Sequence, residues 1–492
     1  MPQNDAKGLE TILGSLGMAA GANSIFRPGS PDDRLNHRVA VGPPLRDEEL
    51  GCQAFGQRPA GPGTRTEDSE PPAVKFVPLA PDSLAKAQLA AAEIEAILLK
   101  FFLTCGAATG HDAAQQIALP FFIVEKVLQS LKADLMLVLK GSASMGDYVY
   151  ELTDAGTHRA RKHADRCAYF GAAPVPLKDY SAAVAAQSLQ RLQIGREQLR
   201  RAFADLTLGE DMFQRVGRAI LSGKGLFLHG PPGNGKTSIA ERVTMAFGTS
   251  IWIPRAISAW GEIIRVFDPS CHEELPPVAG DSLMNAEKVD RRWVRIRRPT
   301  IVVGGELLMD NLEITVNRET GIMEAPVQMK SNCGVLVIDD FGRQQIPPAA
   351  LLNRWIVPLE KRHDYLNLAS GRKIQVPFDQ FIIFSTNLEP RDLVDEAFLR
   401  RIPYKIDVRN PTEDEFRRVF RQVADAARVE FRTEGLDHLI DKYYKGTGRQ
   451  MRFCHPRDLV HQVTVYYRFL QQPPRTSVEA LDAAATDYFS VM

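Results

Sequence analysis

The sequence lacks an excess of charge of one sign, a cluster of cysteines and a long uninterrupted apolar run. The chain of 492 residues has 60 basic and 60 acidic side chains, so any surface that attracts nucleic acid or an anionic membrane must be local. Its six cysteines are scattered and form no CxxC pair, which argues against a zinc site and a disulfide framework. The apolar runs carry charges and are too short to span a membrane.

The first residues, "MPQNDAKGLETILGSLGMAAG", lack the basic start and continuous apolar core of a signal peptide. We therefore expect a cytoplasmic protein without a membrane partner. Residues 1–75 contain nine prolines and ten glycines and have poor apolar periodicity. Such a segment buries too little apolar surface to offset its ordering entropy, so we expect a disordered tail, with a docking peptide inside it as the alternative.

Residues 76–166 have a different character. Helical spacing is present in "SLAKAQLAAAEIEAILLKFFLTCG", in "GHDAAQQIAL" and after Pro120, and two β-rich runs around a Gly/Ser loop follow, before a helix that Thr153 or Asp154 would start. Three helices and then a hairpin resemble a winged helix-turn-helix module. Its ten acids and nine bases are a weak electrostatic footprint for DNA, so we favour a protein contact. Residues 167–194 are expected to be a linker.

The sequence does contain a phosphate-binding loop. "GLFLHGPPGNGKTSIAERV" has the order strand, loop, helix, and its loop fits the pattern G-x4-G-K-T. Glycines let successive backbone N–H groups face phosphate oxygens, and the helix that follows adds the positive end of its dipole. Lys236 would reach the terminal phosphates, and the Thr237 hydroxyl would ligate Mg²⁺. The expected nucleotide-binding residues are Gly230, Pro231, Pro232, Gly233, Asn234, Gly235, Lys236, Thr237 and Ser238.

Two more strands carry polar residues at their ends. "CGVLVIDDFGRQ" is an apolar run of the kind found in buried parallel strands, and it ends in Asp339 and Asp340. In nucleotide hydrolases the first such carboxylate holds Mg²⁺ and the second polarises the attacking water. "FDQFIIFSTNLEP" ends near Asn387, whose amide can orient that water. Three arginines follow at helix ends, namely Arg400, Arg401 and Arg457.

This set of motifs resembles the AAA+ ATPases over about residues 195–490. The resemblance assigns Walker A to 230–237, Walker B to 335–340, sensor 1 to Asn387, an arginine finger to Arg401 or Arg400, and sensor 2 to Arg457. It implies an α/β P-loop core with a parallel sheet at 195–404 and a helical lid at 405–492, with ATP and Mg²⁺ between them. An arginine finger acts on a neighbour's ATP, so the resemblance also implies a homo-oligomer, with a hexameric ring favoured.

One departure and one insertion refine the resemblance. Most AAA+ proteins have Asp-Glu at Walker B, whereas this chain has Asp-Asp, as in many bacterial replication initiators and helicase loaders, so hydrolysis by Asp340 could be slow. Two hairpins are expected, one turning at "RETG" and one at "ASG" within 369–371. The second is similar to the pre-sensor-1 insertion of bacterial MoxR-like, sigma-54 activator and RuvB-like proteins, whose hairpins project toward the pore or the partner.

The stretch "DRRWVRIRRP" at 290–299 packs five arginines around a tryptophan. It is open to three interpretations, namely a nucleic-acid contact through cations and a stacking ring, a subunit interface, or a solvated strand. The function hypotheses are correspondingly three. We favour a ring-forming, chaperone-like remodelling ATPase that acts on a protein client; the alternatives are a DNA-directed ATPase that loads or regulates, and a nucleotide-gated scaffold with little turnover.

Overall fold

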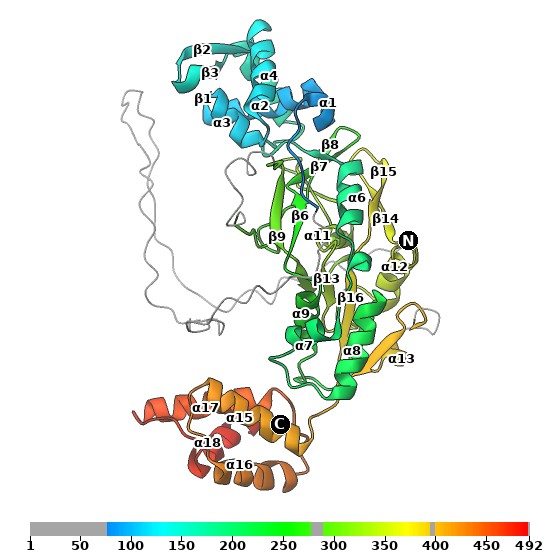
Figure 1. Ribbon diagram of the computed structural model, residues 1–492, viewed down its shortest axis with the longest axis vertical. Helices are drawn as coiled ribbons and strands as arrows, with labels where there is room; N and C mark the ends of the chain where they lie inside the picture. Colours follow the sequence, from blue (N-terminus) through cyan, green and yellow to red (C-terminus); the bar gives the residue numbers. More distant parts are fainter. Residues whose placement is uncertain (1–75, 277–288, 394–398, 491–492) are drawn as a thin grey trace, which may run out of the picture. The chain divides into compact units, whose positions relative to one another are not determined.

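The computed structural model describes residues 76–276, 289–393 and 399–490 (Figure 1). All of them belong to one unit, Ser69–Met492. The expected disordered tail, residues 1–75, lies outside the described residues.

Residues 76–166 form helices around a small antiparallel sheet with the strand order β1-β3-β2. The elements are α1 (Leu84–Ala87), α2 (Ala91–Cys105), β1 (Ala107–Thr109), α3 (Gly110–Ile117), α4 (Phe121–Ala133), β2 (Leu137–Ser142), η1 (Ser144–Gly146), β3 (Tyr148–Leu152) and α5 (Asp154–Ala164). Thr153 caps α5 by accepting a hydrogen bond from Gly156 N at 3.0 Å, as expected. The first stretch with helical spacing in the sequence forms two helices, α1 and α2, and not one. Gln88 takes a left-handed conformation that ends α1.

The prediction of a linker at 167–194 is wrong. This segment contains β4 (Val175–Pro176), α6 (Leu177–Ala186) and the 3-10 turn η2 (Leu189–Arg191). The ring of Tyr180 on α6 is fully buried, and its hydroxyl donates to Met329 O at 3.2 Å and accepts from Asn332 Nδ2 at 2.8 Å. The segment is therefore an integral part of a packed core.

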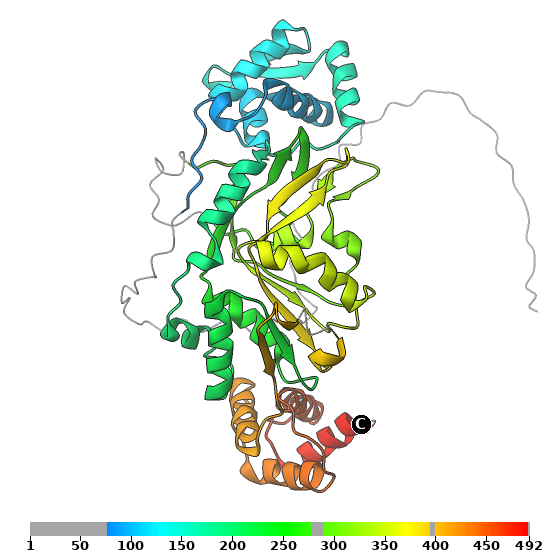
Figure 2. The ribbon, with the colours of Figure 1, turned by 90° about the vertical axis from the view of Figure 1, so that its right-hand side faces the viewer.

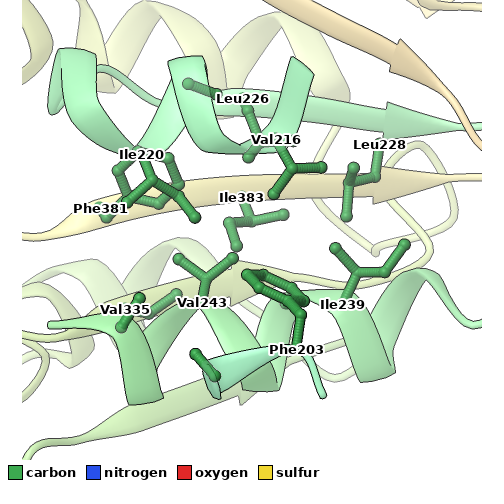
Figure 3. Close-up of a cluster of buried hydrophobic side chains, with 14 of the residues drawn as sticks. Phe203, Val216, Ile220, Leu226, Leu228, Ile239, Val243, Val335, Phe381 and Ile383 are labelled. Atoms are coloured by element: carbon green, nitrogen blue, oxygen red, sulfur yellow. The ribbon is translucent and has the colours of Figure 1, made fainter. Parts of the chain in front are cut away.

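The main sheet has five parallel strands in the order β10-β13-β16-β5-β17. They are β10 (Thr300–Val303), β13 (Val335–Ile338), β16 (Phe381–Thr386), β5 (Leu226–His229) and β17 (Tyr404–Asp407). Val335 and Val337 face one core, and Leu336 and Ile338 face another, so β13 is buried on both sides as a parallel strand requires. The first core, drawn in Figure 3, is built with α7 (Arg196–Ala202), α8 (Glu210–Ser222) and α9 (Lys236–Ala246). The second is built with α12 (Pro348–Lys361).

A second group of elements lies between α9 and β13 in the sequence, before and after β10 of the main sheet. It comprises β6 (Ser250–Pro254), β7 (Ala256–Ala259), β8 (Glu262–Arg265), β9 (Trp293–Arg297), the 3-10 turn η3 (Met309–Leu312), β11 (Thr315–Val316), β12 (Met323–Glu324) and α11 (Val327–Lys330). Both expected hairpins are confirmed. The first pairs β11 with β12. The second pairs β14 (His363–Asn367) with β15 (Lys373–Pro377) directly before β16, and its two strands are labelled in Figure 1.

The arginine-rich stretch proves to be largely structural. Arg292 is buried, pairs with Asp290 at 2.8 Å and donates to Ala87 O at 3.3 Å. Arg298 is also buried and donates to Cys333 O. Trp293, the expected stacking ring, is buried edge-on against Phe76 with 5.5 Å between ring centroids. None of the three interpretations therefore describes the whole stretch, because two of its cations and its ring are used inside the protein.

The C-terminal region is all helical (Figure 2). It contains α15 (Glu413–Ala426), α16 (Thr433–Leu439), the π-helical turn η4 (Ile440–Lys445), α17 (His455–Phe469) and α18 (Val478–Phe489). All of these elements lie within 405–492, where the resemblance implied a helical lid. No helix within the described ranges is both long and apolar enough to cross a bilayer.

Candidate functional site

Three loops meet at the carboxyl edge of the main sheet. The glycine-rich loop 230–235 follows β5, the pair Asp339-Asp340 follows β13, and Asn387 follows β16. The three strands are parallel, with β16 between the other two, so their carboxyl ends lie side by side. Crevices at this edge are where parallel α/β sheets bind ligands.

The glycine-rich loop depends on backbone conformations that glycine adopts readily. Gly235 is left-handed (φ 79°) and precedes α9, so the first N–H groups of α9 have no partner within the helix. Gly233 is also left-handed, and a Cβ there would lie only 2.5 Å from Cys454 Sγ. Cys454 N donates to Gly233 O at 2.9 Å, and Phe453 N donates to the buried Asn234 at 3.3 Å. The C-terminal helical region therefore contacts the loop directly.

Lys236 holds a fixed position at the end of this loop. Its ammonium group donates to Gly230 O at 2.9 Å, to Pro231 O at 3.0 Å and to Asn387 Oδ1 at 2.6 Å. Burial lowers the pKa of Lys236, and the nearby carboxylates of Asp339 and Asp340 partly offset this effect. The side chain is thus a buried cation that points toward the ends of the neighbouring strands.

The two carboxylates join the same network. Thr237 Oγ1 donates to Asp339 Oδ2 at 2.9 Å, and Asn387 Nδ2 donates to Asp340 Oδ1 at 3.0 Å. The structure therefore joins, in one hydrogen-bonded network, the five side chains to which the sequence assigned a role toward phosphate, metal or water. The hydroxyl of Thr237 and the carboxylate of Asp339 are oxygen ligands of the kind that Mg²⁺ prefers.

A cavity of about 930 Å³ opens beside this network. Pro232 to Ser238 line it together with Asp339, Asp340, Asn387 and Arg457. The residues of its other walls were not named from the sequence, although a helical lid beside the nucleotide was expected. They come from the segment 205–212, from 407–409 and from α15, and Thr207 Oγ1 donates to Gln422 across them at 2.9 Å. The volume lies within the range of small-molecule sites, about 300–1,000 Å³, and suits a nucleotide.

The three predicted arginines are divided between two places. Arg457 lies in the first turn of α17, lines the cavity and pairs with Asp458 at 3.2 Å. Arg400 and Arg401 precede β17 and lie at the opposite, amino edge of the sheet, where they line a separate cavity of about 650 Å³. Arg401 pairs there with Glu360 at 2.7 Å. Part of the helix expected before them, residues 394–398, lies outside the described residues.

Arg401 is too far along the sheet to join the network of its own chain. Tyr404 pairs with Leu226, at the start of the strand that the glycine-rich loop follows. The four residues of β5 span about 13 Å at about 3.3 Å per residue, and Arg401 lies beyond their amino end. Whatever Arg400 and Arg401 contact at that edge belongs to a different site.

The strand order of the main sheet and the hydrogen-bonded network around Lys236 together identify the fold of the core. The core has a P-loop α/β fold. A family model described as a domain of unknown function (DUF8689) matches residues 412–487, which span α15 to most of α18. A search of curated proteins found no significant match.

Solved structures with similar arrangements include two bacterial proteins. The Thermotoga maritima RuvB Holliday junction branch migration motor is 13% identical, with a TM-score of 0.32 over 62% of this chain and 74% of that chain. NtrX from Brucella abortus in complex with ADP is 14% identical, with a TM-score of 0.36 over 59% of this chain and 57% of that chain. This chain thus spans less than two thirds of NtrX, which has also been crystallised with ATP. At these scores the fold assignment rests on the strand order and site of this chain alone.

Proposed function

We propose that this chain is a Mg²⁺-dependent ATPase of the AAA+ type, which assembles into a ring and remodels a protein client. The observation that carries the proposal is the hydrogen-bonded network around Lys236. It connects the glycine-rich loop, the Asp339-Asp340 pair and Asn387, and it faces a cavity of nucleotide size. The hydrogen bond from Asn387 orients the second carboxylate, Asp340, and a nucleotide-gated scaffold that does not hydrolyse ATP would not need this orientation.

Each side chain has a distinct role in this proposal. Lys236 and the N–H groups of the glycine-rich loop bind the phosphates, and Thr237 and Asp339 hold Mg²⁺. When bound, Mg²⁺ neutralises charge on the phosphate oxygens. Asp340 accepts the proton of the attacking water, and the amide of Asn387, already 3.0 Å from Asp340 Oδ1, orients that water. Arg457 contacts the terminal phosphate from the helical lid.

A second copy of the chain would complete the site. Arg401 and Arg400 lie at the edge of the sheet opposite their own glycine-rich loop, so they can act only on the nucleotide of a neighbouring subunit. Repeating that head-to-tail contact closes a ring, and we propose a hexamer.

The observations on the client side favour a protein over DNA. Residues 76–166 have the element order of a winged helix, and we propose that this module acts as an adaptor. Its acids and bases nearly balance. The arginine-rich stretch that supported a DNA contact keeps Arg292, Arg298 and the ring of Trp293 inside the protein.

The tip of the β7–β8 hairpin is a candidate client contact. Trp260 and Gly261 form its two-residue loop, and both have positive φ (54° and 79°). Such loops favour Asn-Gly, and a bulky residue in this conformation is strained. Trp260 is nevertheless 70% exposed, and the guanidinium of Arg372, from the β14–β15 hairpin, lies 5.2 Å from the centroid of its ring. A tryptophan at this position is disfavoured by the left-handed backbone and gains little stability from burial, because most of its surface is exposed. We therefore propose that Trp260 binds the client.

Replacing Trp260 by asparagine should therefore have opposite effects on stability and on client binding. Asn tolerates the left-handed conformation, so the free energy of unfolding should stay the same or rise by up to about 1 kcal/mol. Capture of the client should fall about 10-fold or more, as for an aromatic anchor residue. Thermal unfolding and quantitative pull-down measure the two effects, and the matched control is Phe469→Ala, which removes another aromatic ring that is 85% exposed.

The proposed function as a whole is tested on the purified chain. We expect Mg²⁺-dependent release of phosphate from ATP by an assembly of several chains, which mass photometry would detect. Stimulation by duplex DNA with a steep salt dependence, in the absence of any protein client, would favour the DNA-directed alternative instead.

A further inference from the structure

The turn that carries the two carboxylates is held by a side chain to which the sequence assigned no role, beyond the Walker B range 335–340. Gln344 Nε2 donates to Asp339 O at 2.8 Å, and Gln344 Oε1 accepts from Gly342 N at 2.9 Å. Both ends of one amide are thus used within a turn of six residues. The side chain of Gln344 is only partly exposed and spans the turn from its first residue to its fourth.

The backbone that this amide holds is unusual at Asp340. This residue has a φ of 48°, in the left-handed region that most side chains avoid and that aspartate tolerates better than most. Two residues later, Gly342 has a φ of 102°. The two positive φ angles turn the chain sharply after β13. The direction of the Asp340 carboxylate, toward Asn387, follows from this turn, because its side chain is short and has little freedom of its own.

Other contacts also hold the turn: Arg343 N donates to Asp340 O at 2.9 Å within it, and Phe341 tethers it to the sheet. Phe341 N donates to Ser385 O at 2.7 Å, and Thr386 Oγ1 donates to Phe341 O at 2.8 Å. The buried Phe341 ring adds packing to these bonds. They anchor the middle of the turn to β16, whereas the Gln344 amide connects its beginning, next to Asp339, with Gly342.

We propose that Gln344 is a positioning residue for ATP hydrolysis, which holds the Asp339-Asp340 turn so that one carboxylate faces the metal position and the other the water position. The inference rests on the proposed ATPase function. It also gives a physical reason for aspartate, rather than glutamate, at position 340. A left-handed turn is tolerated by aspartate, and the clamped backbone makes a longer side chain unnecessary.

The substitution that tests this role is Gln344→Met, which keeps the length and shape of the side chain and removes both hydrogen bonds. We expect kcat to fall about 10- to 100-fold, which is the usual effect of removing a residue that orients a metal-binding group through a hydrogen bond. The Kd for ATP should stay unchanged, because both hydrogen bonds of the Gln344 amide lie within its own turn and Gln344 does not line the cavity. Gln345→Ala, at the exposed neighbouring position, is the matched control and should keep the native kcat.

A second variant separates positioning from mere structural support. In Gln344→Glu, the carboxylate can accept from Gly342 N but cannot donate to Asp339 O, whereas the protonated acid can do both. Its kcat, taken relative to the native protein at each pH, should therefore rise as the pH falls from about 8 toward about 5, closer to the ordinary glutamate pKa of about 4.3. The same ratio for Gln344→Met should stay flat.

The possible results separate this inference from the function on which it rests. Native turnover with an unchanged kcat in Gln344→Met overturns the role of Gln344 and leaves the ATPase intact. A joint loss of kcat and ATP affinity in Gln344→Met, without recovery of Gln344→Glu at low pH, also overturns it, because the residue would then only support the fold. A native chain that binds ATP without hydrolysing it contradicts the proposed function itself, and this inference with it.

Discussion

Replacing Asp340 with asparagine is expected to lower kcat for ATP hydrolysis by about 10²- to 10⁴-fold, the usual contribution of a general base. Asparagine has the same shape, tolerates the same left-handed backbone and retains an oxygen for the hydrogen bond from Asn387, which is 3.0 Å long in the native protein. It cannot accept the proton of the attacking water. Steady-state phosphate release, compared with the native protein at saturating Mg²⁺ and ATP, measures the loss.

The same variant should bind ATP as well as the native chain does. Asp340 makes no hydrogen bond to Lys236 or Thr237, whose side-chain partners are Asn387 and Asp339, respectively. A stalled ring should then hold its client, so pull-down in ATP should recover more client with this variant than with the native protein. Undiminished turnover in Asp340→Asn would show that a different group activates the water.

Removing Arg401 is expected to lower kcat by about 10³- to 10⁵-fold, the range for arginine fingers in related nucleotide hydrolases. The charge of this guanidinium would stabilise the transition state on a neighbouring subunit, since it lies at the opposite edge of the sheet from its own glycine-rich loop. Arg400→Ala is measured in parallel, because either arginine of the pair could be the finger. Glu360→Gln controls for the loss of the ion pair to Arg401, which is 2.7 Å long.

A mixing experiment decides whether this arginine acts between subunits. Arg401→Ala and Asp340→Asn are each expected to be nearly inactive alone. In mixed rings, a site with the native Asp340 can stand next to a subunit with the native Arg401, so ATP hydrolysis should reappear on mixing. If the mixture stays inactive although mass photometry shows mixed rings, Arg401 does not act in trans.

The parts of the site that the sequence predicted are those in which local chemistry dictates residue type. Phosphate binding needs glycines at fixed spacing before Lys236, and two carboxylates at the end of a buried parallel strand, in a chain with such a loop, are typical of a metal and water site. Asn387 could be placed because it also follows an apolar strand, and parallel strands bring their ends to one edge. The P-loop core and both hairpins followed from the same local patterns.

The parts that could not be predicted depend on contacts between distant segments. The sequence of α6 is rich in alanine and resembles a linker, and only the buried environment of Tyr180 makes it part of a core. An arginine pattern does not reveal which guanidinium groups are buried, and Arg292 is paired with Asp290 inside the protein. The hydrogen bond from Thr207 to Gln422 joins residues 215 positions apart, a separation that no spacing rule describes.

The most direct test of the account is a calorimetric titration of Mg²⁺-ATP into the purified native chain and into Lys236→Ala. Lys236 is the buried cation at the centre of the network, so we predict saturable binding by the native chain and none by a variant that remains folded by circular dichroism. Equal affinity in both proteins, or no binding by the native chain at any concentration tested, would contradict a nucleotide site at this edge of the sheet.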